Sequence, residues 1–168
     1  MKRIITIGRQ CGSGGHTIGK MVAERLGIPF YDKEIIQKVS EITGLSEKTV
    51  EEEGEYSKTG LFFNIEPRGL TGYNVADSNK MLLRDQVNAY QTQYIKEIAE
   101  KGPCVIVGRS ADYILHDRDD CINVFISGTL EDRKNRVEIE HKISAKDSES
   151  HVLDRDKKRS KYYKYITD

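Results

Sequence analysis

A cluster of glycines with interleaved polar residues lies close to the N-terminus. The segment reads Gly8-Arg9-Gln10-Cys11-Gly12-Ser13-Gly14-Gly15-His16-Thr17. Glycines let a backbone curl around an anion and point N–H groups at it, and a helix starting there adds a partial positive charge. We therefore predict that the loop binds phosphate; the alternative is a tight turn between a strand and a helix. The candidate residues are Gly12, Ser13, Gly14, Gly15, His16 and Thr17.

This loop departs from the strict phosphate-binding pattern G-x-x-x-x-G-K-[ST]. If Gly14 is aligned with the second glycine of the pattern, Gly15 stands where the lysine belongs. Thr17 then falls one place beyond the hydroxyl residue of the pattern. We expect Thr17 to be the magnesium contact, because its hydroxyl opens the helix after the glycines.

The elements around the loop alternate between short apolar runs and amphipathic segments. An apolar run at 4–7 precedes the loop, and a helix follows it up to Gly27. The pattern predicts further strands at 28–31, 104–107 and 122–126, and helices at 33–43, 46–53, 79–101 and 130–142. Strands alternating with helices indicate a parallel sheet, in which ligands bind beyond the carboxyl ends of the strands. The glycine loop, Asp32 and Arg109 would meet at that edge.

Composition narrows the class of protein. The chain has 168 residues, with 27 Lys and Arg against 27 Asp and Glu. A balanced charge gives no footprint for nucleic acid, and no apolar run approaches the ~20 residues of a membrane span. The N-terminus carries no signal-peptide pattern, and the three cysteines lack metal-ligand spacing. We expect one cytoplasmic domain over 1–168 with reduced thiols, a small-molecule nucleotide substrate, and neither nucleic acid nor membrane as partner.

Several motifs in chain order resemble the cytidylate kinase-like family, a branch of the P-loop nucleoside monophosphate kinases. The resemblance covers nearly the whole chain. The motifs are Ile4-Ile5-Thr6, Gly12-Ser13-Gly14-Gly15 with Thr17, Pro29-Phe30-Tyr31-Asp32-Lys33, Val105-Ile106-Val107-Gly108-Arg109 with Asp112, and Asp156-x-x-Arg159 followed by Tyr162-Tyr163.

The resemblance implies an α/β three-layer P-loop kinase fold, with a parallel sheet of order 2-3-1-4 and a helical lid. It places a substrate-binding insertion at the irregular segment 54–78 and the lid at about 144–165. The family usually adds a fifth strand and a tryptophan. This chain has no tryptophan, and we expect the fifth strand to be missing.

The resemblance also distributes roles among the residues. Residues 12–17 would hold the phosphates of ATP, with Thr17 near Mg²⁺. Asp32, Arg109 and Asp112 would bind the acceptor. Arg155 and Arg159 of the lid, and Arg133 before it, would be catalytic cations, because arginines bind phosphate bidentately and stay charged.

Several of these residues also have a purely structural explanation. An N-cap explains Asp32, a surface ion pair explains Arg109, and a solvated helix face explains the basic run around Arg155 and Arg159. Relatives with a glycine at the lysine position tend to carry arginine next, whereas this chain has His16, and loss of one transition-state donor costs roughly 10²–10³ in rate.

The sequence favours an enzyme that transfers the γ-phosphoryl group of ATP to a small acceptor, with CMP or another nucleoside monophosphate as the first choice. Two alternatives stay open. One is a catalytically weak nucleotide- or phosphate-binding regulatory module, and the other is a kinase of a non-nucleotide metabolite.

Overall fold

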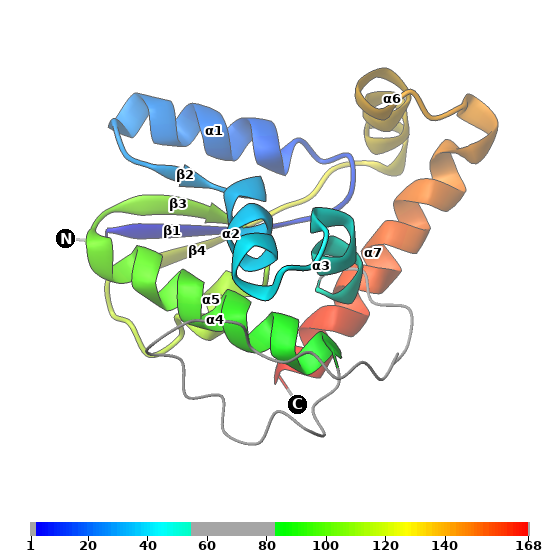
Figure 1. The fold of residues 1–168 in the computed structure, drawn as a ribbon. Coiled ribbons are helices and arrows are strands. Elements are labelled where there is room, and N and C mark those ends of the chain that lie inside the picture. The colour runs from blue at the N-terminus through cyan, green and yellow to red at the C-terminus, as the bar shows by residue number, and fades with distance from the viewer. Residues whose placement is uncertain (1–2, 55–82, 168) are drawn as a thin grey trace.

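The computed structural model describes residues 3–54 and 83–167, and within them a four-stranded parallel sheet forms the centre of the molecule (Figure 1). The order β2-β3-β1-β4 confirms the predicted arrangement of these strands. The strands are β1 (Ile4–Arg9), β2 (Phe30–Tyr31), β3 (Cys104–Val107) and β4 (Cys121–Ile126).

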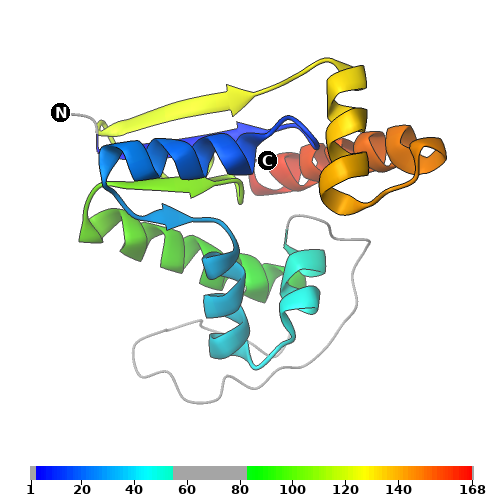
Figure 2. The same cartoon turned by 90° about the horizontal axis from the view of Figure 1, so that it is seen from above.

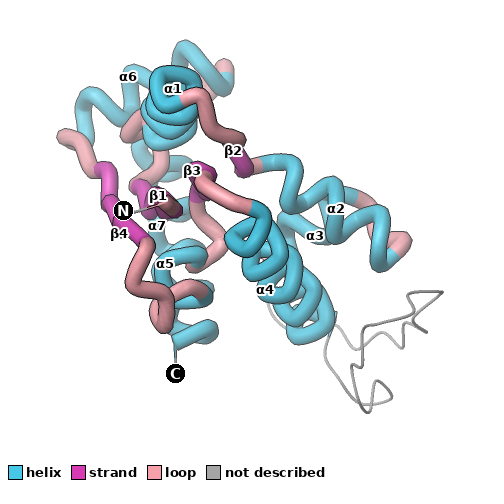
Figure 3. Tube along the Cα trace, turned by 90° about the vertical axis from the view of Figure 1, so that its left-hand side faces the viewer, coloured by secondary structure: helices cyan, strands magenta, loops and turns pink. Residues whose placement is uncertain are grey.

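Helices cover both faces of this sheet. Figure 3 shows α1 on one face and α4 and α5 on the other, while α2 and α3 extend beyond β2. The last two helices, α6 and α7, lie at the carboxyl ends of the strands, as Figure 2 shows from above. The bounds are α1 Gly15–Leu26, α2 Lys33–Thr43, α3 Glu47–Glu53, α4 Leu83–Lys101, α5 Ala111–Ile114, α6 Leu130–His141 and α7 Ala145–Thr167.

The core lies on both sides of β3, which is buried along its whole length. Val105 and Val107 pack with Ile7 and Ala23 on the α1 side. On the other side, Ile106 packs in a cluster with Ile95. This continuous burial explains why β3 is an unbroken apolar run, as strands covered on both faces require. The glycine loop follows strand β1, which pairs with β3 on one side and with β4 on the other.

Two expected segments differ from the structure in extent. The C-terminal run forms one helix of 23 residues, α7, where the sequence indicated a polar turn or helix start followed by a charged segment. The insertion expected at 54–78 lies, except for Gly54, outside the described residues, as do the first four residues of the helix expected at 79–101. None of the described helices has the length and apolar character that a membrane span requires.

Candidate functional site

The loop between β1 and α1 takes a conformation that depends on two glycines. Gly12 and Gly14 have φ values of +73° and +82°, in the left-handed region that side chains disfavour. Gly14 is the N-cap of α1, so the helix begins at Gly15. The left-handed turns direct the chain from the strand into the helix and expose the helix N-terminus at the loop.

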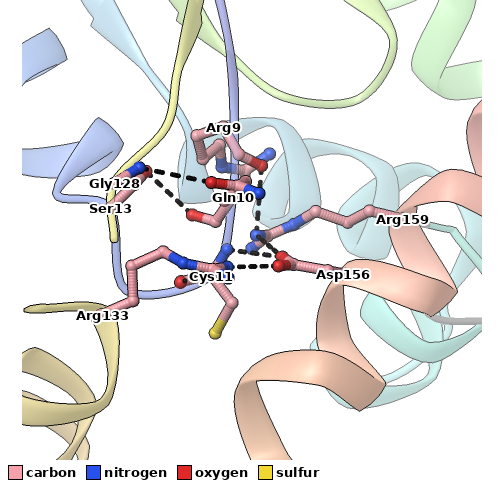
Figure 4. A network of polar contacts seen from close by, with 8 residues as sticks. All are labelled: Arg9, Gln10, Cys11, Ser13, Gly128, Arg133, Asp156 and Arg159. Atoms are coloured by element: carbon pink, nitrogen blue, oxygen red, sulfur yellow. Dashed lines mark hydrogen bonds and ion pairs between the residues drawn. The ribbon is translucent and has the colours of Figure 1, made fainter. Parts of the chain in front are cut away.

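Carbonyl groups on the strand side of the loop are bound by the protein itself (Figure 4). Arg159 donates to the carbonyl of Arg9 at 3.4 Å. The hydroxyl of Ser13 donates to the carbonyl of Gln10 at 2.9 Å. Arg133 donates to the carbonyl of Cys11 at 3.4 Å. These contacts turn the negative ends of three successive peptide groups away from any anion that enters the loop.

Donor groups on the helix side of the loop are left open. Among the described residues, no protein acceptor binds the backbone N–H of Gly12 or the N–H groups of residues 14–17. The loop lines a cleft of about 490 Å³. Unpaired N–H groups at a helix N-terminus attract anions. Of the residues predicted to bind phosphate, Gly12 and residues 14–17 form a donor-rich wall of this cleft. Ser13 lies outside its lining and donates both its N–H and its hydroxyl to the carbonyl of Gln10.

Arginines from three other segments line the same cleft. Arg109 follows β3, Arg136 belongs to α6, and Arg155 and Arg159 belong to α7. The guanidinium carbon of Arg136 lies 3.3 Å from the position that a Cβ on Gly14 would take. A permanent cation therefore stands beside the loop, although the loop itself carries no lysine.

His16 and Asp32 bind each other at the entrance of the cleft. Nδ1 of His16 donates to Oδ2 of Asp32 at 2.6 Å, and the imidazole stands edge-on to Phe30. Asp32 is the N-cap of α2, but its side chain makes no capping hydrogen bond. The N-cap interpretation therefore does not account for the carboxylate, which joins the starts of α1 and α2 instead.

Arg109 occupies a strained turn directly after β3. Arg109 and Ser110 have φ values of +58° and +51° and follow Gly108 at +75°. Arg109 is 2 % exposed, and its Nε and Nη1 atoms have no hydrogen-bond partner among the described residues. A buried guanidinium with free donors is costly for stability. Backbone strain of this kind is concentrated at functional sites, so Arg109 stays a candidate for binding an anion.

A second cavity of about 700 Å³ lies on the other side of the loop, under α7. Arg109 and Arg159 reach both cavities. Asp112 lines only this second one, where its carboxylate accepts a hydrogen bond from Tyr163 at 2.9 Å. The structure therefore brings Asp32, Arg109, Arg155 and Arg159 to the phosphate cleft but places Asp112 away from it.

Arg133 also lies outside the lining of the phosphate cleft. Its guanidinium is buried and forms an ion pair with Asp156 of α7. Asp156 in turn accepts a hydrogen bond from the backbone N–H of Cys11 at 2.6 Å. The predicted catalytic cation is thus part of the structure that supports the loop.

Buried amides near Arg109 escaped the sequence analysis. Gln91 of α4 is fully buried, and its side-chain oxygen has no partner in the part of the chain that the structure describes. Asn88 accepts a hydrogen bond from Tyr162 at 2.8 Å, while its own amide nitrogen has no partner among these residues. The signal in the sequence is an amide, Gln91, four residues after the buried Val87 and seven before the buried Ile98, which is helical spacing.

Cys11 is an inert thiol in this setting. A helix N-terminus lowers thiol pKa values, but burial dominates here and raises the pKa of Cys11 above its ordinary value. Among the described residues, no group of three or more His, Cys, Asp or Glu side chains could hold a metal ion.

A parallel sheet of this order, with a glycine loop after β1 and arginines lining the cleft beside it, is the arrangement of α/β kinase folds. The family model of the cytidylate kinase-like family matches residues 4–168, and the chain belongs to this family. Membership places the chain among kinase-type phosphoryl-transfer proteins.

Two solved structures share the fold. An uncharacterized protein from Eubacterium ventriosum ATCC 27560 is 26% identical, with a TM-score of 0.66 over 98% of this chain and 77% of that chain. Shikimate kinase from Bacteroides thetaiotaomicron is 16% identical, with a TM-score of 0.58 over 97% of this chain and 82% of that chain. No curated protein sequence matches this chain.

Proposed function

We propose that this protein transfers the γ-phosphoryl group of ATP to a small acceptor that carries its own phosphate, with CMP or another nucleoside monophosphate as the acceptor. The observation that carries the proposal is the division of the loop's polar groups. The carbonyls of residues 9–11 are bound by protein donors, and the N–H groups of Gly12 and residues 14–17 open onto a cleft lined by arginines. Phosphoryl transfer needs little more from a protein than positioned donors and cations.

The two halves of the cleft take separate roles in this proposal. The N–H groups of Gly12 and residues 14–17 hold the phosphates of ATP, and Thr17 holds the accompanying Mg²⁺. Magnesium neutralises charge that develops on the transferred group. Arg109 holds the phosphate of the acceptor, because its unpaired donors require an anion. Arg155 and Arg159, both from the lid helix α7, surround the transferred group.

All three thiols are free in the structure, which suits the reducing cytoplasm as the site of this reaction. The test is release of ADP from Mg-ATP in a coupled assay, with a panel of nucleoside monophosphates and of small hydroxylated metabolites as acceptors. We expect turnover with at least one monophosphate and loss of that turnover in Arg109→Met. Arg118→Met is the matched control, because Arg118 pairs with Asp120 and Glu100 far from the cleft.

A nucleotide-binding module without turnover is the second candidate function. The observation in its favour is that His16, next to the position of the missing lysine, is held by Asp32. Tight binding of Mg-ATP without ADP release for any acceptor would support the module and contradict the enzyme. Turnover with a hydroxylated metabolite alone would keep the kinase and replace the acceptor.

A further inference from the structure

One peptide segment of the loop is held by two side chains that also hold each other. The backbone N–H of Cys11 donates to Oδ1 of Asp156 at 2.6 Å, and the carbonyl of Cys11 accepts from Nη1 of Arg133 at 3.4 Å. The same Nη1 also donates to Oδ2 of Asp156. Figure 4 shows this closed ring of contacts between β1–α1 loop, α6 and α7.

The backbone of α6 also packs directly against the loop. A Cβ placed on Gly12 would lie 2.4 Å from the carbonyl oxygen of Arg133. The left-handed turn at Gly12 is therefore fitted to the first turns of α6, and Arg133 supplies both the surface and the hydrogen-bond donor. No other side chain than hydrogen can occupy this position without moving the loop.

The opposite charges of Arg133 and Asp156 favour the pairing of these two side chains. Arg133 is nearly buried, with its side chain 7% exposed, and Asp156 is 23% exposed. A buried charge without its partner is strongly unfavourable. Arg159 lies 3.9 Å from the same carboxylate and binds the carbonyl of Arg9. Helices α6 and α7 therefore each supply an arginine that binds a loop carbonyl. Both arginines, Arg133 and Arg159, also lie against the carboxylate of Asp156.

We propose that Arg133 and Asp156 form a positioning clamp, which fixes the direction of the open N–H groups of Gly12 and residues 14–17 and couples them to helices α6 and α7. The inference rests on the proposed function, in which those N–H groups bind phosphate. Neither residue lines the phosphate cleft, so both act through the loop and neither is a catalytic residue. Loss of either partner frees the peptide at Cys11 and misdirects the donors that follow it.

The test measures binding of inorganic pyrophosphate and of Mg-ATP by calorimetry in Asp156→Ala, Arg133→Met and the double variant. We expect each single variant to bind both pyrophosphate and Mg-ATP ~10-fold or more weakly, since small misplacements of binding groups have effects of this size. The double variant should lose no more affinity than the single variant that binds more weakly, because both substitutions disrupt the same pair of interacting residues. Asp154→Asn is the matched control: it removes the exposed pair with Lys158 on the same helix, leaves the contacts of Asp156 with Arg133 and Cys11 in place, and should bind like wild type.

A second readout separates a clamp from general destabilisation. Hydrogen exchange should accelerate at the Cys11 amide in both variants while β3 stays protected. Asp156→Glu, which retains the carboxylate, should recover part of the lost affinity. Unchanged pyrophosphate binding in Asp156→Ala, additive losses in the double variant, or exchange that rises equally over the whole chain would overturn the clamp. If wild type binds neither pyrophosphate nor ATP, the proposed function fails, while exchange at the Cys11 amide still decides whether the clamp exists.

Discussion

Nδ1 of His16 and Oδ2 of Asp32 lie 2.6 Å apart, and this contact joins the start of α1 to the start of α2. The imidazole is half-exposed, whereas the carboxylate is largely covered. One residue comes from the predicted phosphate loop and the other from the predicted acceptor site. The contact therefore forms a bridge between the two sides of the cleft, at the place where ATP and acceptor would meet.

Replacing His16 tests whether a fixed cation within the glycine loop itself would strengthen nucleotide binding. His16→Arg should bind Mg-ATP about 3- to 10-fold more tightly, because a guanidinium keeps its charge and pairs with both Asp32 and phosphate. His16→Gln is the control that keeps a polar side chain without charge, and it should not tighten binding. Calorimetry at constant ionic strength makes the comparison, and equal affinities for the two variants would contradict it.

Gly12→Ala should disable the loop, and Gly44→Ala provides a control with matched backbone strain. Both glycines have left-handed φ values, +73° and +71°, but a Cβ on Gly44 meets nothing within 4 Å. The strain alone amounts to roughly 1–2 kcal/mol. We expect Gly44→Ala to lower the free energy of unfolding by that amount and to bind ATP normally.

In Gly12→Ala the clash with the Arg133 carbonyl adds to the strain, so the loss should reach about 3 kcal/mol or more. ATP affinity should fall with it, because the loop must move away from α6. Denaturant titration and calorimetry on both variants decide the matter. Equal stability losses and equal ATP affinities would show that the contact between Gly12 and α6 has no part in binding.

Arg109→Met should separate stability from binding. Removing a buried guanidinium with two unpaired nitrogens should leave the free energy of unfolding unchanged or raise it by about 1–3 kcal/mol. Binding of the acceptor should weaken at least 10-fold, while ATP affinity changes little. A strongly destabilised variant would indicate that Arg109 is a structural residue, and the acceptor assignment would then be wrong.

Buried thiols make the fold sensitive to alkali. Burial raises the pKa of Cys104 to about 11, and that of Cys11 is also raised. In the unfolded chain a thiol loses its proton at lower pH than in the fold, so stability is retained at lower pH and falls as pH rises from about 9 towards 11. The loss is about 1.4 kcal/mol per pH unit for one thiol.

Denaturant titrations between pH 8 and 10.5 test this dependence. Cys104→Ala should flatten the fall relative to wild type, although its stability at pH 7 is lower. Cys121→Ala is the comparison: it removes a partly exposed thiol of β4 that contributes less than burial to the raised pKa of Cys104, so it should flatten the fall less than Cys104→Ala does. A slope that Cys104→Ala leaves unchanged would assign the alkaline loss to lysines and tyrosines.

The sheet could be predicted because its strands are short apolar runs that glycines and prolines delimit. The glycine loop could also be predicted from the sequence, because its shape depends on residues that are adjacent in the chain. Arg133 and Asp156 belong to charged helical segments that resemble a solvated surface, and only the crossing of α6 and α7 brings them to Cys11. Burial of Gln91 likewise depends on what covers α4, which periodicity does not encode.

One helix, α7, reaches both ends of the site. Its 23 residues span about 34 Å, with Asp156 and Arg159 at the loop and Tyr162 and Tyr163 hydrogen-bonded to Asn88 and Asp112. A rigid helix that is held at two places moves as one body. Binding of a ligand at one end of α7 and the contacts at the other end then depend on the same movement, so each of the two ligands would change the affinity of the protein for the other by the same factor.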